Sequence, residues 1–152
     1  MTETAPDREN TLVMTLDHGT VVIRLRPDLA PGHVARMKEL AREGFYDGLS
    51  FYRVIDGFVA QGGDLSETRP VETAKKTLPA EFDDAAPAGL AFSALPDRDG
   101  YAPVAGFIGS LPAGMDASRK RAWHLHCTGA MAMARDEGRD TGGTEFYITL
   151  QP

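Results

Sequence analysis

The sequence contains a single cysteine, Cys127, and no window of 18 uninterrupted apolar residues. One cysteine excludes an internal disulfide and fits a reducing compartment. The missing apolar run argues against a membrane-spanning helix, and residues 1–10 lack the apolar core of a secretory signal. We therefore expect a cytoplasmic protein that has no membrane partner.

Positive charge is also scarce, because 16 Lys and Arg residues face 22 Asp and Glu residues and give a net charge of −6. The one compact basic run, Arg119–Arg121, is short, so nucleic acid is not an expected partner. A chain of 152 residues suits one domain with a sizeable core. We expect a disordered tail over residues 1–10 and a single domain over residues 11–152.

The first half of the chain changes from a strand pattern to a helix pattern. Residues 11–16 and 20–25 are β-rich runs around a short turn, which predicts an opening hairpin. Apolar residues at spacings of three and four then predict an amphipathic helix over about residues 31–43, closed by Gly44. A second hairpin is expected from residues 50–55 and 58–61, around an Asp-Gly turn.

The middle of the chain has no clear period between Leu65 and Lys120. Six prolines interrupt it and argue against long helices or central strands there: Pro70, Pro79, Pro87, Pro96, Pro103 and Pro112. Strand-like runs return at residues 122–127, 129–134 and 144–150.

One segment, residues 51–64, indicates a chemistry. Residues two apart share a face of a strand, so Arg53 lies with Ile55, and Val59 lies with Gln61. An isolated arginine on a strand is usually a solvated edge residue, but here an aromatic ring and a carboxamide accompany it. Such a surface suits a polar backbone that carries an apolar ring, and a proline-containing peptide has both.

The same segment resembles the signature of cyclophilin-type peptidyl-prolyl isomerases, Phe-His-Arg-Val-Ile-x-Gly-Phe-x-x-Gln-Gly-Gly-Asp, with Tyr52 in place of the usual histidine. The opening hairpin and helix also match, as do residues 129–135 against Gly-x-x-x-Met-Ala-Arg and residues 144–148 against Ser-Gln-Phe-Phe-Ile. The resemblance is to bacterial members. It implies a mostly β fold, a cyclophilin-like antiparallel β-barrel with a helix after the first hairpin.

The chemistry of such an enzyme needs neither a metal nor another cofactor. An X–Pro amide rotates slowly, because resonance keeps it planar behind a barrier of about 18–20 kcal/mol. A catalyst must favour the twisted amide, whose prolyl nitrogen regains a lone pair that can accept a hydrogen bond. Arg53 is the candidate donor, because arginine is always protonated and rich in N–H groups. The expected function is isomerisation of X–Pro bonds in peptides or unfolded chains during protein folding.

The resemblance also implies a set of substrate-binding residues. Gln61, placed beside Arg53, can bind the substrate backbone through both ends of its amide. The prolyl ring is expected against Phe58, Val59, Met133 and Tyr147. Backbone contacts are expected at Ala134 and Arg135. Glu145 stands where the family usually has glutamine, and its carboxylate is expected near Arg53, where it either steadies the arginine or ties it up.

Two alternatives stay open at this stage. One is a non-catalytic module of cyclophilin-like fold that binds proline peptides or acts as a chaperone, and Glu145 favours it. The other is a metal-binding domain, because alternation places His124 and His126 on one strand face next to Cys127. Phe146, on the face opposite Tyr147, is expected to be a core residue. The sequence gives no indication of the oligomeric state.

The chain departs from the family pattern in two regions. Residues from about 83 to 121, rich in Pro, Gly and Ala, are an insertion that we expect to form a surface excursion near the peptide groove. The sequence stops at Pro152, before the tryptophan, leucine and histidine that the family brings to the groove. We therefore expect a barrel that is incomplete at its C-terminus, and a fragment of a longer isomerase.

Overall fold

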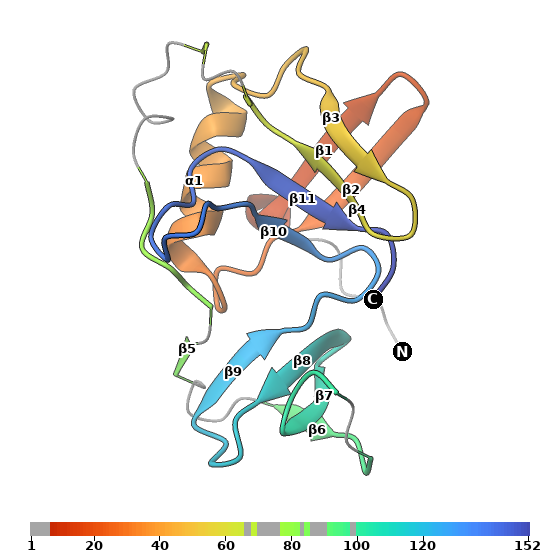
Figure 1. Ribbon diagram of the computed structural model, residues 1–152, viewed down its shortest axis with the longest axis vertical. Coiled ribbons are helices and arrows are strands. Elements are labelled where there is room, and N and C mark those ends of the chain that lie inside the picture. Colours follow the sequence, from red (N-terminus) through yellow and green to blue (C-terminus); the bar gives the residue numbers. More distant parts are fainter. Residues whose placement is uncertain (1–6, 66–67, 70–76, 83, 86–90, 98–99) are drawn as a thin grey trace.

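An antiparallel hairpin opens the fold, with β1 (Thr11–Leu16) paired to β2 (Gly19–Arg24). The computed structural model describes residues 7–65, 68–69, 77–82, 84–85, 91–97 and 100–152 (Figure 1). Its elements are mostly antiparallel strands arranged in three sheets, with one α-helix after the hairpin among the described residues. The predicted fold class is confirmed, and the hairpin lies within one residue of its predicted bounds.

The helix α1 (Pro31–Arg42) begins with proline at its first position, where the missing N–H is not needed. Three apolar side chains at spacings of three, Val34, Met37 and Leu40, are buried under it. Gly44 ends the helix with φ +67°, a conformation that glycine adopts without steric cost. These features agree with the helix predicted over residues 31–43.

The first turn of α1 is capped by a side chain that is distant in the sequence. Ala30, at the N-cap, offers no side-chain acceptor. The Glu81 carboxylate accepts hydrogen bonds from the N–H groups of Gly32 (2.8 Å) and His33 (3.0 Å), and it contacts His33 Nδ1 at 2.6 Å. The carboxylate thus satisfies two otherwise unpaired N–H groups and faces the positive end of the helix dipole.

We expect Glu81→Gln to lower the free energy of unfolding at about pH 7 by roughly 0.5–2 kcal/mol, the usual effect of losing a cap. Burial raises the pKa of Glu81, but the hydrogen bonds from His33 and Gly32 outweigh it, and the net pKa is lowered from 4.5. A lowered carboxyl pKa stabilises the fold above the unfolded-state pKa, and this contribution is lost as the pH falls through the folded-state pKa. In urea unfolding, the loss of unfolding free energy in Glu81→Gln should therefore shrink below about pH 4.5.

Glu137→Gln is the control for this prediction. An equal loss of unfolding free energy in Glu81→Gln at all pH values would contradict the capping role.

A four-stranded sheet in the order β10-β11-β4-β3 lies beside α1 (Figure 1). Its strands are β3 (Phe51–Ile55), β4 (Val59–Gly62), β10 (Met131–Met133) and β11 (Phe146–Thr149). One face of this sheet is core: the Phe146 ring is 5% exposed and meets Tyr46 and Phe51 edge-on, at centroid distances of 5.6 and 5.9 Å. The expectation that Phe146 is a core residue is confirmed.

The pairing of β3 with β4 contains a β-bulge. Phe51 lies opposite Gly62 and Arg53 lies opposite Gln61, so Tyr52 is an extra residue in β3. In a regular strand Phe51 and Arg53 would share a face. The bulge lets Phe51 pack on the core ring of Phe146 while Arg53 joins Gln61 on the other face. It thus turns the arginine out of the core.

A five-stranded sheet in the order β5-β9-β8-β7-β6 forms the lower part of Figure 1. Its strands are β5 (Asp84–Ala85), β6 (Phe92–Ala94), β7 (Val104–Ile108), β8 (Leu111–Met115) and β9 (Arg121–His124). Four buried side chains form its core cluster: Ile108, Ala113, Met115 and Ala122.

This sheet corrects two expectations about the middle of the chain. The six prolines argued against central strands, yet β8 is central and contains Pro112. Proline is tolerated there because it lies at the end of the β8–β9 ladder, where its carbonyl still accepts the N–H of Leu125 at 3.1 Å while the residue is in register with Phe107 of β7. The insertion over about 83–121 is also not a surface excursion, because its described residues build strands around a buried cluster; residues 83, 86–90 and 98–99 of it lie outside the described residues.

The N-terminal segment is structured from Asp7 on. Arg8–Asn10 form a 3-10 turn, and the Asp7 carboxylate accepts the N–H of Glu9 at 3.0 Å. Glu9 in turn forms ion pairs with two side chains of α1, Lys38 and Arg42. The remainder of the expected disordered tail, residues 1–6, lies outside the described residues. None of the helices formed by the described residues has the length and apolar character needed to cross a membrane.

Candidate active site

Arg53 and Gln61 form the centre of the candidate site. They face each other on β3 and β4, and Arg53 Nη1 donates to Gln61 Oε1 at 3.0 Å. The guanidinium carbon of Arg53 also lies 5.8 Å from the centroid of the Phe58 ring, which is 53% exposed. The arginine is therefore exposed to solvent but held at two points, by a carboxamide and by an aromatic ring.

The Gln61 amide can adopt only one orientation. Arg53 can only donate hydrogen bonds, so the carbonyl oxygen of Gln61 must face it. The carboxylate of Glu145 can only accept, so the NH₂ group of Gln61 must face Glu145. Nε2 of Gln61 donates to Glu145 Oε2 at 3.1 Å and to the hydroxyl oxygen of Tyr52 at 2.6 Å. Both donors of the amide are thus occupied. Only the carbonyl end of Gln61 is therefore left for a substrate, although the sequence predicted that both ends of the amide would bind it.

Tyr52 and Glu145 are joined by a hydrogen bond from the tyrosine hydroxyl to Glu145 Oε2. Burial, followed by this bond and the negative charge of Glu145, raises the pKa of Tyr52 to about 12. The described residues form no ion pair between Glu145 and Arg53. Glu145 thus lies close to the arginine, as expected, but acts on it through Gln61.

We expect Tyr52→Phe to loosen the Gln61 amide, because the substitution removes the shortest acceptor of Nε2. The side-chain NH₂ signals of Gln61 should shift and exchange faster with water, and the loss of the hydrogen bonds should cost about 0.5–1.5 kcal/mol of stability. Proton–nitrogen correlation spectra of the free protein would measure both the shift and the exchange. Tyr101→Phe, in the segment before β7, is the control, and unaltered Gln61 signals in Tyr52→Phe would contradict the network.

Two further side chains border the Gln61 face of the sheet. Val59 shares this face by alternation and is 3% exposed, and Tyr147 lies directly opposite Gln61 on β11. Burial raises the pKa of Tyr147, and its hydroxyl lies 3.3 Å from Nδ1 of His126. His126 is thus a neighbour of the site that the sequence did not assign to it, because it follows the end of β9 and reaches Tyr147 only through the fold.

The remaining predicted residues, Met133, Ala134 and Arg135, lie at the end of β10 and just after it. Met133 is paired with Phe146, whose ring faces the core, so register places Met133 on the side of the sheet away from Gln61. The N–H of Ala134 donates to the carbonyl of Glu145 at 2.8 Å. Arg135 follows it and stacks on the ring of Phe82 at 5.0 Å. Strand pairing and hydrogen bonds thus connect Arg53, Gln61, Tyr147, Glu145 and Ala134, whereas Met133 lies on the other side of the sheet.

The histidine cluster does not form a metal centre among the described residues, which contain no group of three or more His, Cys, Asp or Glu side chains placed to hold an ion. His124 ends β9, whereas His126 lies beyond the strand, so the predicted strand alternation does not extend to both. Burial, and then the nearby charges of His126 and Arg26, lower the pKa of His124 to about 4.

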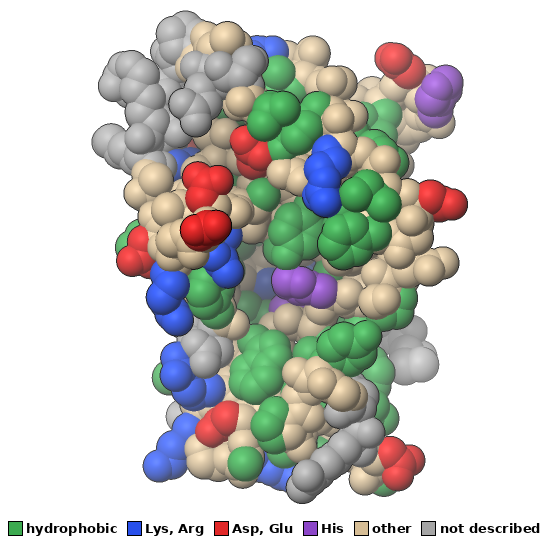
Figure 2. Space-filling view, viewed as in Figure 1, with side chains coloured by type: hydrophobic (Ala, Val, Ile, Leu, Met, Phe, Trp, Pro, Cys, Tyr) green, Lys and Arg blue, Asp and Glu red, His purple; other side chains and the backbone are tan. Residues whose placement is uncertain are grey.

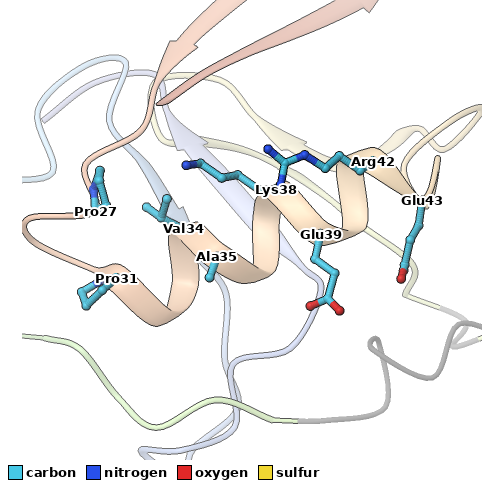
Figure 3. A pocket seen from close by; sticks show the side chains of 8 residues that line it. All are labelled: Pro27, Pro31, Val34, Ala35, Lys38, Glu39, Arg42 and Glu43. Carbon is cyan, nitrogen blue, oxygen red and sulfur yellow. The ribbon is translucent and has the colours of Figure 1, made fainter. Parts of the chain in front are cut away.

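A separate groove of about 550 Å³ lies along the outer face of α1 (Figure 3). Its floor is apolar, and Figure 3 shows Lys38 and Arg42 along one side of the helix, with Glu39 and Glu43 along the other. None of the predicted site residues lines this groove. The candidate site is therefore the Arg53 face of the four-stranded sheet.

Comparison with known proteins decides the family. The family model described as cyclophilin type peptidyl-prolyl cis-trans isomerase/CLD matches residues 11–152. The chain belongs to the cyclophilin family. Among curated relatives of this cyclophilin, peptidyl-prolyl cis-trans isomerase B of Bacillus subtilis is 32% identical over 136 residues, which cover 90% of this chain and 68% of the relative.

Other relatives are matched over only part of their own length. A probable peptidyl-prolyl cis-trans isomerase of Brucella suis is 56% identical over 64 residues, which are 42% of this cyclophilin and 33% of the Brucella protein. The crystal structure of cyclophilin AquaCyp293 from Hirschia baltica superposes with a TM-score of 0.79 at 30% identity, covering 94% of this chain and 58% of that one. The structural match supports the cyclophilin fold over nearly the whole chain.

This cyclophilin departs from the family pattern at two positions that touch each other. Tyr52 replaces a histidine and Glu145 replaces a glutamine, and the structure joins the two side chains by a hydrogen bond. The sequence placed Tyr52 in β3 without a role, because strand alternation alone points it away from Arg53. The bulge at Tyr52 is what brings it to Gln61.

Proposed function

We propose that this cyclophilin is a peptidyl-prolyl cis-trans isomerase, in which Arg53 stabilises the twisted X–Pro amide. The observation that supports this function best is the state of Arg53: its Nη1 is held by Gln61 and its cation lies near the Phe58 ring, yet the side chain is exposed. A guanidinium has five N–H donors, and this arrangement leaves others for a substrate. The donors are thus preorganised before the substrate arrives.

The proposed catalysis needs no bond cleavage and no proton transfer. The prolyl nitrogen gains a lone pair only when the amide twists, so an Arg53 donor that meets this nitrogen stabilises the twisted state more than either planar state. Such differential stabilisation lowers the barrier, whereas equal binding of planar and twisted forms would not. The Arg53 donor is fixed by Gln61 and loses little freedom in the transition state.

The other roles follow from the geometry around Arg53. We assign the prolyl ring to Phe58 and Tyr147, which flank the arginine and the Gln61 face, and we assign Val59, which is 3% exposed, to the apolar packing beneath them. Met133, predicted for the same pocket, lies on the other side of the sheet in register with Phe146, and we assign it to packing. Gln61 accepts from Arg53 and offers its remaining carbonyl lone pair to the substrate. Ala134 and Arg135 are assigned to the substrate backbone, and Glu145 to the orientation of Gln61.

We further propose that proline-containing peptides or unfolded chains are the substrates, that the reaction assists protein folding, and that it takes place in the cytoplasm without a cofactor. The acidic composition and the single cysteine support this setting. The domain assignment over residues 11–152 is supported by the extent of the family match.

Exchange spectroscopy on a short peptide with one X–Pro bond would test the function directly. With catalytic amounts of the protein, exchange peaks between cis and trans forms should appear at mixing times of seconds or less, although uncatalysed exchange takes tens to hundreds of seconds. Shifts of peptide signals without exchange peaks would instead support the binding module of cyclophilin-like fold. No shift and no exchange would contradict both.

A further inference from the structure

Phe82 carries an arginine at each of two positions around its ring. The guanidinium carbons of Arg135 and Arg139 both lie 5.0 Å from its centroid, so they are no farther apart than twice that distance. The ring remains 44% exposed. Stacking uses the flat faces of the guanidinium groups and leaves N–H edges available to acceptors.

These two arginines have no carboxylate partner within the described part of the chain, where none of the ion pairs includes them. Nη1 of Arg135 donates to the backbone carbonyls of Asp136 (2.8 Å) and Glu137 (3.3 Å). The Asp140 carboxylate, from the same loop, accepts the N–H of Ala80 at 2.7 Å. Among the described residues, no carboxylate neutralises Arg135 or Arg139, and this pair of charges suits an external anion.

A pocket of about 330 Å³ opens beside this stack, and we call it the Phe82 pocket. It is lined by Phe82, Arg139 and two residues of β9, Arg121 and Trp123. Figure 2 shows arginine and lysine side chains gathered along this edge of the molecule, at the level of β5 and β9 in Figure 1. Two aromatic rings can pack the methylene groups of a side chain while guanidinium groups bind an anionic end bidentately.

A chain of contacts links Phe82 to the candidate active site. Arg135, which stacks on Phe82, directly follows Ala134, whose N–H is bonded to the carbonyl of Glu145. The Glu145 side chain in turn contacts Gln61, the partner of Arg53. A peptide that lies along this edge and places its proline at Arg53 would extend toward Phe82.

We propose that the Phe82 pocket binds an anionic side chain of the client peptide, so that this isomerase prefers clients with an acidic residue within a few positions of the proline. The inference rests on the proposed function, because it places the proline at Arg53. It adds a second recognition point, which selects among clients by charge.

Trp123 is the only tryptophan of the chain and lines the pocket, so its fluorescence reports occupancy directly. The experiment titrates the whole chain with proline peptides that carry Glu, Gln or phosphoserine at one of these positions, on either side of the proline. In one register the Glu peptide should bind about tenfold more tightly than the Gln peptide, the usual strength of a charge-assisted hydrogen bond, and change the Trp123 emission. A still tighter phosphoserine peptide would identify a phosphorylated client as the source of the anion, whereas a weaker one would identify a carboxylate.

Arg139→Gln should abolish the preference for Glu over Gln and leave the affinity of the Gln peptide unchanged. Arg24→Gln, on β2 and outside the pocket, changes the net charge equally and should keep the preference. Equal binding of Glu and Gln peptides in every register, or equal loss in both variants, would overturn the proposal. If no proline peptide binds but an acidic peptide without proline alters Trp123 emission in the wild type and not in Arg139→Gln, the anion pocket stands and the proposed function fails.

Discussion

Arg53→Ala should lower kcat/KM for X–Pro isomerisation by about 10²–10³-fold, the cost of removing one preorganised donor from a developing charge or lone pair. The loss should fall mainly on kcat, because the donor meets the prolyl nitrogen only in the twisted state. Peptide affinity should change little, since Phe58 and Tyr147 still offer their apolar surface. A protease-coupled assay gives the rate, and a fluorescence titration gives the affinity.

Two controls separate this role from a general effect of charge. Arg53→Lys keeps the charge but loses the planar fork that reaches both Gln61 and a substrate, so it should recover only part of the rate. Arg24→Ala, on the exposed hairpin strand β2, should leave the rate unchanged. Full activity in Arg53→Ala would remove the arginine from the mechanism and leave the fold without its proposed catalyst.

Gly63→Ala is expected to lower the free energy of unfolding by roughly 2–6 kcal/mol. This range is the sum of the usual costs of backbone strain and of overpacking. Gly63 has φ +126°, a region that other residues rarely adopt. An added Cβ would lie 2.7 Å from Cα of Glu145 and 3.2 Å from the carbonyl oxygen of Thr144, which are backbone atoms that cannot move without shifting the strand. Urea unfolding would measure the loss.

The same substitution should disturb the site, because the backbone that must move carries Glu145. The Gln61 amide signals should shift in Gly63→Ala even where the protein is still folded. Gly100→Ala is the matched control, since a Cβ there meets no atom of the described residues within 4 Å and its φ lies outside the left-handed region. A stability change of equal size in both variants would point to chain entropy alone and contradict the contact with Glu145.

Local patterns in the sequence predicted the elements that have local causes. The opening hairpin and α1 follow from alternation, helical spacing and the glycine at residue 44, and the structure places them within a residue of the predicted bounds. The prediction for the middle of the chain was wrong for a physical reason. A proline argues against a central strand only where its missing N–H would face a partner. Pro112 lies at the end of the β8–β9 ladder and keeps its carbonyl bond to Leu125, so the strand continues through it.

The candidate site was predicted in its centre and missed at its edges. Arg53 and Gln61 pair as strand neighbours, which alternation could foresee. The contacts of Tyr52 with Glu145, of Tyr147 with His126 and of Phe82 with its two arginines join residues far apart in the sequence. No local period encodes such contacts, and only the register of the sheet and the course of the loops create them.

The bulge in β3 makes the site sensitive to length as well as to composition. Tyr52 is one residue more than β4 can pair with, and this surplus places Phe51 and Arg53 on opposite faces although they are two apart. Deleting Tyr52 would give a regular ladder in which Phe51 and Arg53, now adjacent, still point to opposite faces, but Gln61 would lose the hydroxyl that accepts from its amide. The surplus residue therefore supplies a contact and not a direction: a one-codon deletion at Tyr52 would keep the arginine on its face and loosen the amide that holds it.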